Sequence, residues 1–169
     1  MKVINRIKRY WIEKSEKPAI IGVTHSLGQN GETPNLDDTV EFLEGLVNEG
    51  DKVMLEGYDY PLSTSFREHV SNDRVAQYME RLARYLEEKR CEIIMGEDEN
   101  LPFKDSRRNE VFVEKILTNN PRFFIVGAAH LDSIKVRLPR HVFVCLPPYA
   151  SVKEARRLYA DIYKSPAFV

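Results

Sequence analysis

The sequence predicts a single three-layer α/β/α domain built on a mainly parallel sheet of five strands. Two observations lead to this fold class. Short apolar segments alternate along the chain with segments whose apolar residues recur at helical spacing. The apolar segments are continuous, and continuous runs are typical of parallel strands that are buried on both faces. Because no linker or internal repeat interrupts this pattern, we expect residues 1–169 to form one domain.

The first expected element is a helix over residues 3–14, which flanks the domain within residues 1–17. Basic residues separate its apolar residues, which recur at helical spacing and are Val3, Ile4, Ile7, Tyr10 and Trp11. Such a helix can lie on a membrane surface or bind a partner, but packing on the flank of its own domain is the interpretation that we favour.

The elements that follow are expected in strict alternation. The strands are the apolar segments at residues 18–25, 51–58, 91–97, 121–130 and 141–147. The helices are the periodic segments at residues 36–50, 72–90, 105–119, 132–138 and 150–164. Gly50 is expected to end the first of these helices, because glycine is favoured just beyond a helix C-terminus. The expected N-caps of the next two helices are Asn72 or Asp73, and Asp105 or Ser106.

The overall composition argues against two classes of partner. With a net charge of −1, the chain has no overall basic character, so neither nucleic acid nor a membrane is expected as a partner, although a local basic cluster is compatible with this total. No apolar run approaches the length of a membrane span, and MKVINRIKRYW lacks the apolar core of a signal peptide. Cys91 and Cys145 lie in apolar segments, so we expect reduced, buried thiols in a cytoplasmic protein.

Ionisable residues follow four of the expected strands. His25, Glu56 and His130 end the first, second and fourth strands, and Glu97 and Asp98 follow the third. In open parallel sheets, ligands bind outside the carboxyl ends of the strands. We therefore expect these residues at the ligand-binding edge of the sheet.

The expected strand order is 3-2-1-4-5, with the reversal of order between the strands that lead to His25 and His130. The tips of the second and fourth strands would then lie roughly 10 Å apart, so Glu56 can converge with the two histidines. The same order separates Cys91 from Cys145 by roughly 19 Å, too far for a disulfide.

Two imidazoles and one carboxylate form a ligand set that divalent metals favour, and the same residues also suit acid–base catalysis without a metal. Both interpretations remain open from the residues alone. The small residues of GAAH at 127–130 allow the backbone to approach a bound group closely, and Gly22 is expected to act similarly before His25. The alternative is that these small residues let a helix pack closely on the sheet.

Four motifs resemble the TraB/TIKI group of the erythromycin-esterase/ChaN-like superfamily: GVTH at 22–25, MLEGY at 54–58, RNEVF at 108–112 and IVGAAHLDSI at 125–134. The pattern of that group is a GxxH motif, an acidic residue after the second strand, an Arg-Asp or Arg-Asn pair that opens a helix, and a late VGxxH followed by leucine. Asn109 stands where Asp is usual, and the second acid that often follows two residues after Glu56 is absent.

This resemblance implies hydrolysis of a peptide or ester bond, and its TIKI-type members imply a metal-dependent enzyme. It implies that His25, Glu56 and His130 are the active-site residues and that they hold a divalent ion such as Zn, Mn or Co. Arg108 is implied as the basic partner that stabilises an oxyanion. The expected substrate is a small molecule or a peptide, and no oligomeric state is predicted.

Arg108 also has a physical argument of its own. In the first turn of a helix its charge opposes the helix dipole, so an anionic partner explains this position better than helix stability does. The candidates for that partner are Glu56, Asp98 and a substrate oxyanion. An ordinary surface arginine beside Arg107 is the alternative.

Two long connections, residues 26–38 and 58–72, are expected to cover the substrate. Glu32 and His69 within them are further candidates, although ordinary surface positions explain both residues. The short chain and the missing second acid leave another function open, a regulatory domain that binds a small ligand without catalysis.

Overall fold

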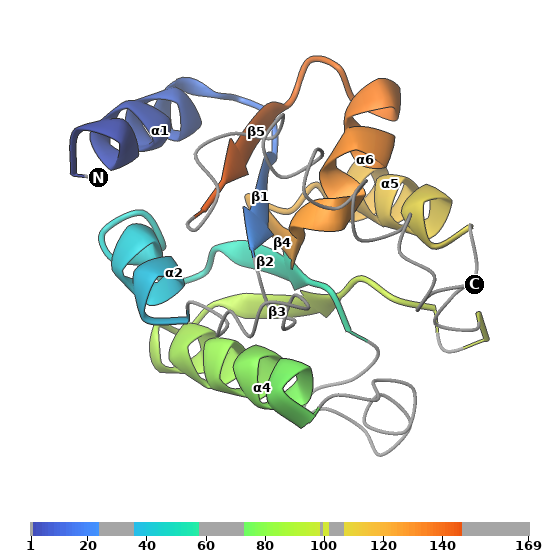
Figure 1. Cartoon of the computed structure of the whole chain (residues 1–169), viewed down its shortest axis with the longest axis horizontal. Coiled ribbons are helices and arrows are strands. Elements are labelled where there is room, and N and C mark those ends of the chain that lie inside the picture. The colour runs from blue at the N-terminus through green and yellow to red at the C-terminus, as the bar shows by residue number, and fades with distance from the viewer. Residues whose placement is uncertain (1, 24–35, 58–72, 99, 102–106, 147–169) are drawn as a thin grey trace, which may run out of the picture.

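The structure, a computed structural model, describes residues 2–23, 36–57, 73–98, 100–101 and 107–146. Within these residues a five-stranded parallel sheet carries helices on both faces (Figure 1). The strands are β1 Ala19–Val23, β2 Lys52–Leu55, β3 Glu92–Met95, β4 Phe123–Gly127 and β5 Val142–Cys145. The predicted α/β fold class is confirmed.

The helices largely follow the predicted segments. They are α1 Lys2–Lys14, α2 Leu36–Leu43, α4 Asp73–Glu88, α5 Arg108–Asn119 and α6 Leu131–Arg137. The helix predicted over residues 36–50 ends at Leu43, because Gly45 adopts a left-handed backbone with a φ of 78°. Asn72, the expected caps at residues 105–106 and the helix predicted at residues 150–164 lie outside the described residues.

The strand predicted over residues 121–130 is shorter than expected. β4 ends at Gly127, and a 3₁₀ turn, η1 Ala128–His130, joins it to α6. The last described pair between β4 and β1 joins Gly127 to Val23, and the last pair between β4 and β2 joins Ile125 to Leu55. His130 therefore lies in the turn beyond the sheet rather than at a strand end.

The strand order is β3-β2-β4-β1-β5, so the predicted order 3-2-1-4-5 is wrong for its two inner strands. β4 pairs with β1 on one side and with β2 on the other. All residues of β1 and of β4 are buried, so their sequences mark both as central strands without distinguishing which of them lies beside β2. β1 and β4 are nevertheless adjacent, as predicted.

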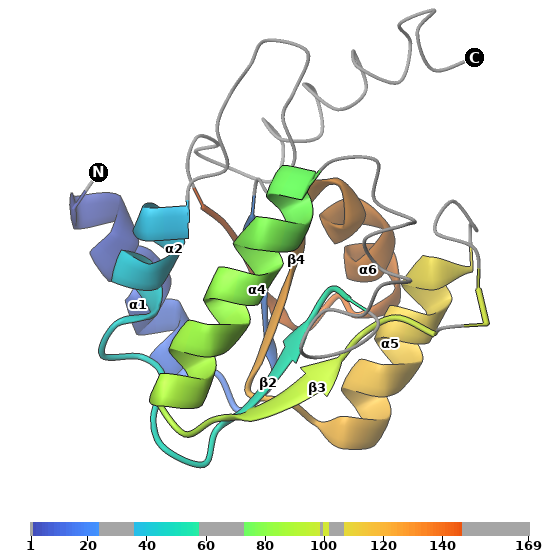
Figure 2. The same ribbon diagram turned by 90° about the horizontal axis from the view of Figure 1, so that it is seen from below.

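The connections between strands pass over both faces of the sheet. α2 and α4, which follow β1 and β2, pack on one face together with α1, and α5 and α6, which follow β3 and β4, pack on the other (Figure 2). β2 and β4 are neighbours, but the chain continues from β2 toward the β3 edge of the sheet and from β4 toward the β5 edge. The two connections therefore run in opposite directions. The reversal therefore lies between β2 and β4, not between β1 and β4, and ligand-binding crevices form at such a point.

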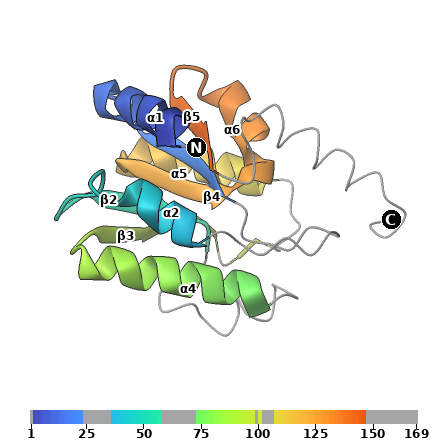
Figure 3. The same cartoon turned by 60° about the vertical axis from the view of Figure 1, so that its left-hand side comes forward.

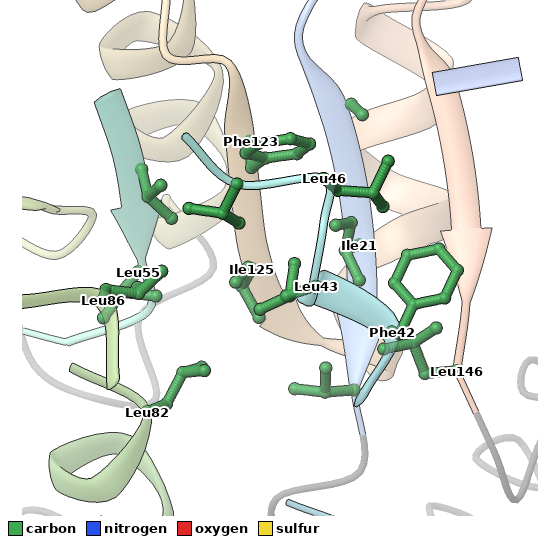
Figure 4. Close-up of a cluster of buried hydrophobic side chains, with 14 of the residues drawn as sticks. Ile21, Phe42, Leu43, Leu46, Leu55, Leu82, Leu86, Phe123, Ile125 and Leu146 are labelled. Atoms are coloured by element: carbon green, nitrogen blue, oxygen red, sulfur yellow. The ribbon is translucent and has the colours of Figure 1, made fainter. Parts of the chain in front are cut away.

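Alternate residues along the strands build the two halves of the hydrophobic core. Ile21 and Ile125 belong to the half beneath α2 and α4, where Phe42 of α2 packs with them (Figure 4). Ile20 and Phe124 belong to the half beneath α5 and α6. Because the central strands are packed on both faces, they are held rigidly, and the polar residues that follow them have well-defined positions.

The expected flanking helix is present as α1, which lies near β5 and α2 (Figure 3). Ile12 is buried in the core, and Lys8 Nζ donates a hydrogen bond of 2.5 Å to the carbonyl oxygen of Cys145. Arg9 Nη2 donates a hydrogen bond to the carbonyl oxygen of Glu41 at 2.6 Å. Across the described part of the chain, no helix has the length and apolar character needed to cross a membrane.

The two cysteines lie at opposite edges of the sheet, and neither of them forms a disulfide. Cys91 directly precedes β3 and is half-buried, and Cys145 is buried at the end of β5. We expect both to react with a thiol reagent after denaturation without reductant, because three strands separate them and a disulfide needs Cα atoms within about 7 Å. Recovery of fewer than two thiols per monomeric chain would contradict the strand order.

Candidate active site at the carboxyl edge of the sheet

Four ionisable residues that the sequence singled out lie together beyond the ends of β2, β3 and β4: Glu56, Glu97, Arg108 and His130. With Asn109, which contacts His130, they form a group that we call the edge cluster. Three expected candidates lie outside the described residues, and they are His25, Glu32 and His69. The edge cluster occupies the point where the connections of β2 and β4 diverge.

Glu56 directly follows β2 and bridges to β4. Its side chain is only 3% exposed, and its backbone N–H donates to the carbonyl oxygen of Ile125 at 3.0 Å. Its Oε2 accepts a hydrogen bond of 2.6 Å from the backbone N–H of Gly127. The polar group that approaches Gly127 is thus the carboxylate of Glu56, which is one of the predicted site residues.

Gly22 has a different role from the one expected. A Cβ atom at this position would clash with the side chain of Leu131, the first residue of α6. Gly22 therefore allows α6 to pack closely on the sheet, which supports the alternative interpretation for this residue.

Glu97 reaches the cluster through a close approach of two backbones. The N–H of Gly96 donates to the carbonyl oxygen of Leu55 at 2.7 Å, and a Cβ on Gly96 would lie 2.9 Å from that oxygen. The N–H of Glu97 then donates to the carbonyl oxygen of Gly57 at 2.9 Å. Gly96 therefore allows the Glu97 carboxylate to be buried beside that of Glu56.

Arg108 begins α5 and lies between the two carboxylates. Its Nη2 donates to Glu56 Oε1 at 2.9 Å, and its Nε donates to Glu97 Oε2 at 3.0 Å. Its Nη2 also contacts Glu97 Oε1. Glu56 was one of the expected partners and is confirmed, whereas the Asp98 carboxylate instead accepts hydrogen bonds from Asn100 within a turn.

Burial and hydrogen bonding have opposite effects on the pKa of Arg108 and on the pKa of Glu97. Burial alone would lower the pKa of Arg108, but its hydrogen bonds to Glu97 and the charges of both carboxylates outweigh burial and raise that pKa. Burial raises the pKa of Glu97; the hydrogen bonds from Arg108 oppose this rise, and the charge of Glu56 adds to it. Two buried carboxylates thus face one guanidinium, an arrangement that favours an additional proton or cation nearby.

His130 is held from both sides of its ring. Its Nδ1 lies 2.8 Å from Asn109 Oδ1, and because an amide oxygen only accepts hydrogen bonds, Nδ1 is the donor. Its Nε2 lies 3.4 Å from Glu56 Oε1. The ring meets the ring of Phe112 edge to face, with centroids 5.3 Å apart. When His130 is neutral, its Nε2 lone pair therefore faces a carboxylate oxygen.

The described donors fit part of a metal site. Two ligands that each lie about 2.1 Å from one tetrahedral ion are roughly 3.4 Å apart, which matches the distance between His130 Nε2 and Glu56 Oε1. An Nδ1–H group held by a carbonyl-type oxygen is also the usual outer contact of a metal-binding histidine. Among the described residues no group of three His, Cys, Asp or Glu side chains is assembled, and the expected third ligand, His25, is not among them.

Two members of the edge cluster were not assigned roles from the sequence. The sequence places Glu97 at a strand end without identifying it as the partner of Arg108, although a Gly-Glu pair after an apolar run is a usable signal. In the sequence, Asn109 stands out only as a departure from the TraB/TIKI pattern. Its position directly after Arg108 is what brings its amide to His130.

Fold and site together define a parallel α/β protein with a buried carboxylate–arginine cluster and a half-buried histidine beyond the carboxyl ends of the strands, the edge at which open parallel sheets generally bind ligands. Comparisons with family models, with curated proteins and with solved structures find no match to this chain.

Proposed function

We propose that the protein is a hydrolase of the TraB/TIKI type that acts with a divalent metal ion at the edge cluster. The observation that carries this proposal is the contact between His130 and Glu56. The Nε2 atom of an imidazole whose Nδ1 is held by Asn109 lies 3.4 Å from a buried carboxylate oxygen. Two electron-rich atoms in this position are stabilised by a positive charge between them, and the motif resemblance supports a metal as the source of that charge.

In this proposal Glu56, His130 and His25 hold the ion, which would be Zn, Mn or Co. When bound, a divalent ion makes a hydroxide available near neutral pH and polarises the bond to be cleaved. Asn109 orients the imidazole of His130, and the N–H of Gly127 holds the Glu56 carboxylate. Arg108 binds Glu56 and Glu97 together, which supports a role in holding Glu56 in place rather than the expected direct contact with an oxyanion.

The proposal extends to the substrate and to the cellular location. We propose a small ester or a peptide as the substrate, on the basis of the motif resemblance. We also propose that the protein works in the cytoplasm, and two cysteines that form no disulfide support a reducing compartment.

The direct experiment is metal analysis of protein purified without chelator, together with thermal unfolding in the presence of Zn, Mn or Co. We expect a bound ion and an increase in Tm, because an ion that binds only the folded state stabilises that state. His130→Ala should abolish both effects. His141→Gln is the matched control, since His141 lies outside the edge cluster between α6 and β5. The absence of a bound ion and of any shift in Tm would contradict the proposal that the protein binds a metal.

Asn109 provides a second test of the proposal. Asn109→Ala is expected to weaken metal affinity about 10–100-fold, because the Nδ1–H of His130 loses its acceptor. Asn109→Asp should retain high affinity, since a carboxylate oxygen also accepts this hydrogen bond. Asn119→Ala is the control, because its amide donates to the carbonyl oxygen of Lys115 within α5. Isothermal titration with Mn or Co measures all three variants, and equal affinities would exclude a role for Asn109.

A metal-free hydrolase is a variant of this proposal, and the two carboxylates that share one guanidinium support it. The excess negative charge of Glu56 and Glu97 is then neutralised by a proton, and His130 and Glu56 act with His25 in acid–base catalysis. Hydrolysis that survives strong chelators but is lost in His130→Ala would favour this variant.

A non-catalytic domain that binds a small ligand is a second candidate. The observation that favours it is the engagement of Arg108 by two carboxylates, because buried ion-pair networks of this kind also serve structure alone. Binding of a ligand or metal without hydrolysis of ester, peptide or phosphoester panels would identify this function.

A further inference from the structure

The α1 helix presents an apolar face to solvent. Ile7, Tyr10 and Trp11 lie three and four residues apart, so they share one side of the helix. Their exposed fractions are 54%, 53% and 60%, and the rings of Tyr10 and Trp11 meet edge to face at 5.7 Å. Large apolar side chains that are exposed side by side can form an interaction site, whereas scattered ones are ordinary surface.

The opposite side of α1 attaches the helix to the domain. Ile12 is 5% exposed in the core, and Lys8, four residues earlier, donates to the carbonyl oxygen of Cys145. Arg9 lies over the ring of Phe42, with its Cζ 5.8 Å from the ring centroid. Among the described side chains of α1, one apolar residue and two basic residues therefore attach the helix to the domain, while Tyr10 and Trp11 are exposed.

The charge of α1 differs from that of the whole chain. The helix contains five basic residues, namely Lys2, Arg6, Lys8, Arg9 and Lys14, against one acidic residue, Glu13. The whole chain has a net charge of −1, so this helix is a local basic segment. Lys14 Nζ lies 6.0 Å from the centroid of the Tyr10 ring, beside the apolar face.

The net charge of the whole chain predicts no membrane partner, but on the basis of the local charge and the exposed apolar face of α1 we propose that this helix binds the protein to an anionic membrane surface. Trp and Tyr are the residues that prefer the boundary between lipid tails and headgroups, and basic residues beside them bind anionic headgroups. The charge complementarity between this basic helix and an anionic bilayer selects the membrane over a second copy of α1, because two copies would repel each other. Three side chains on one helix also fall short of the roughly 20–30 residues that a stable protein interface uses on each side.

The chain contains a single tryptophan, so Trp11 reports directly on this face. We expect its fluorescence to shift to shorter wavelengths when vesicles of phosphatidylserine and phosphatidylcholine are added, and the protein should sediment with them. Vesicles of phosphatidylcholine alone should bind far less, and salt should weaken binding. Arg6→Ala and Lys14→Ala should each lower the partition coefficient roughly fivefold.

The double variant Ile7→Ala/Tyr10→Ala keeps the tryptophan and should bind anionic vesicles at least about tenfold more weakly. Its matched control is Leu117→Ala/Val136→Ala, which removes two exposed apolar side chains from α5 and α6 and should bind as the wild type does. Thermal unfolding of both variants should match that of the wild type.

Two results would overturn the proposal. One is that anionic vesicles neither shift the Trp11 fluorescence nor carry the protein into the pellet. This result would also cover the cases in which the apolar face of α1 mediates self-association or binds an acidic protein. The other is equal binding by the double variant and its control. Neither result bears on hydrolysis or on metal binding at the edge cluster.

Discussion

Arg108→Ala is expected to lower the free energy of unfolding by about 3–5 kcal/mol, because it leaves two buried carboxylates without their cation. The side chains of Glu56 and Glu97 are 3% and 1% exposed, so water cannot readily replace the guanidinium. Arg108 also donates hydrogen bonds to both residues, and an unsatisfied buried acceptor adds to the cost. Urea denaturation of the variant and the wild type measures this difference.

The matched control is Arg81→Ala in α4. Arg81 is 68% exposed, and its Nη2 lies 3.9 Å from the carboxylate of Asp37. An exposed pair of this kind contributes about 0–1 kcal/mol, so the control should remain close to the wild type. Glu97→Gln should cost less than Arg108→Ala, because burial and the charge of Glu56 already disfavour the ionised form of Glu97 and raise its pKa. Equal stability of Arg108→Ala and Arg81→Ala would contradict the ion-pair network.

Glu56→Gln is expected to reduce hydrolysis about 10²–10⁴-fold while the protein stays folded. The amide oxygen can still accept a hydrogen bond from Gly127 or Arg108, but the negative charge beside His130 Nε2 is lost. This charge is what the proposal requires, both for holding a divalent ion and for acid–base work. Hydrolysis of ester and peptide panels, with and without added metal, measures the loss.

Glu110→Gln is the control for that substitution. Glu110 lies in the first turn of the same helix as Arg108, is exposed, and pairs with Arg137 at 3.1 Å. This variant should keep the activity of the wild type. If Glu56→Gln were as active as Glu110→Gln, the edge cluster would not be the catalytic site.

The sequence predicts the fold class well, because periodicity reports burial directly. A continuous apolar segment such as FFIVG is typical of a strand that is buried on both faces, and FFIVG forms the fully buried β4. Periodicity does not show which of the two inner strands, β1 or β4, lies beside β2. β1 and β4 are equally buried, and only their pairing with β2 distinguishes them.

The position of the candidate site could be predicted from the sequence, but most of the hydrogen bonds and ion pairs within it could not. Their positions at strand ends made Glu56 a predicted site residue and Glu97 a candidate. The position of Arg108 at the start of a helix, where its charge opposes the helix dipole, indicated an anionic partner. Which carboxylates bind Arg108, and the contact between Asn109 and His130, depend on side-chain packing across three elements. No local pattern in one segment reports such contacts.

A crystal structure of the protein grown with Mn or Co, examined by anomalous diffraction, would show whether a metal ion binds at the edge cluster. We expect an anomalous peak within coordination distance of His130 Nε2 and a carboxylate oxygen of Glu56, with Nδ1 still bound to Asn109. A map with no peak at the edge cluster, in which His130 instead forms a direct hydrogen bond with Glu56, would contradict it.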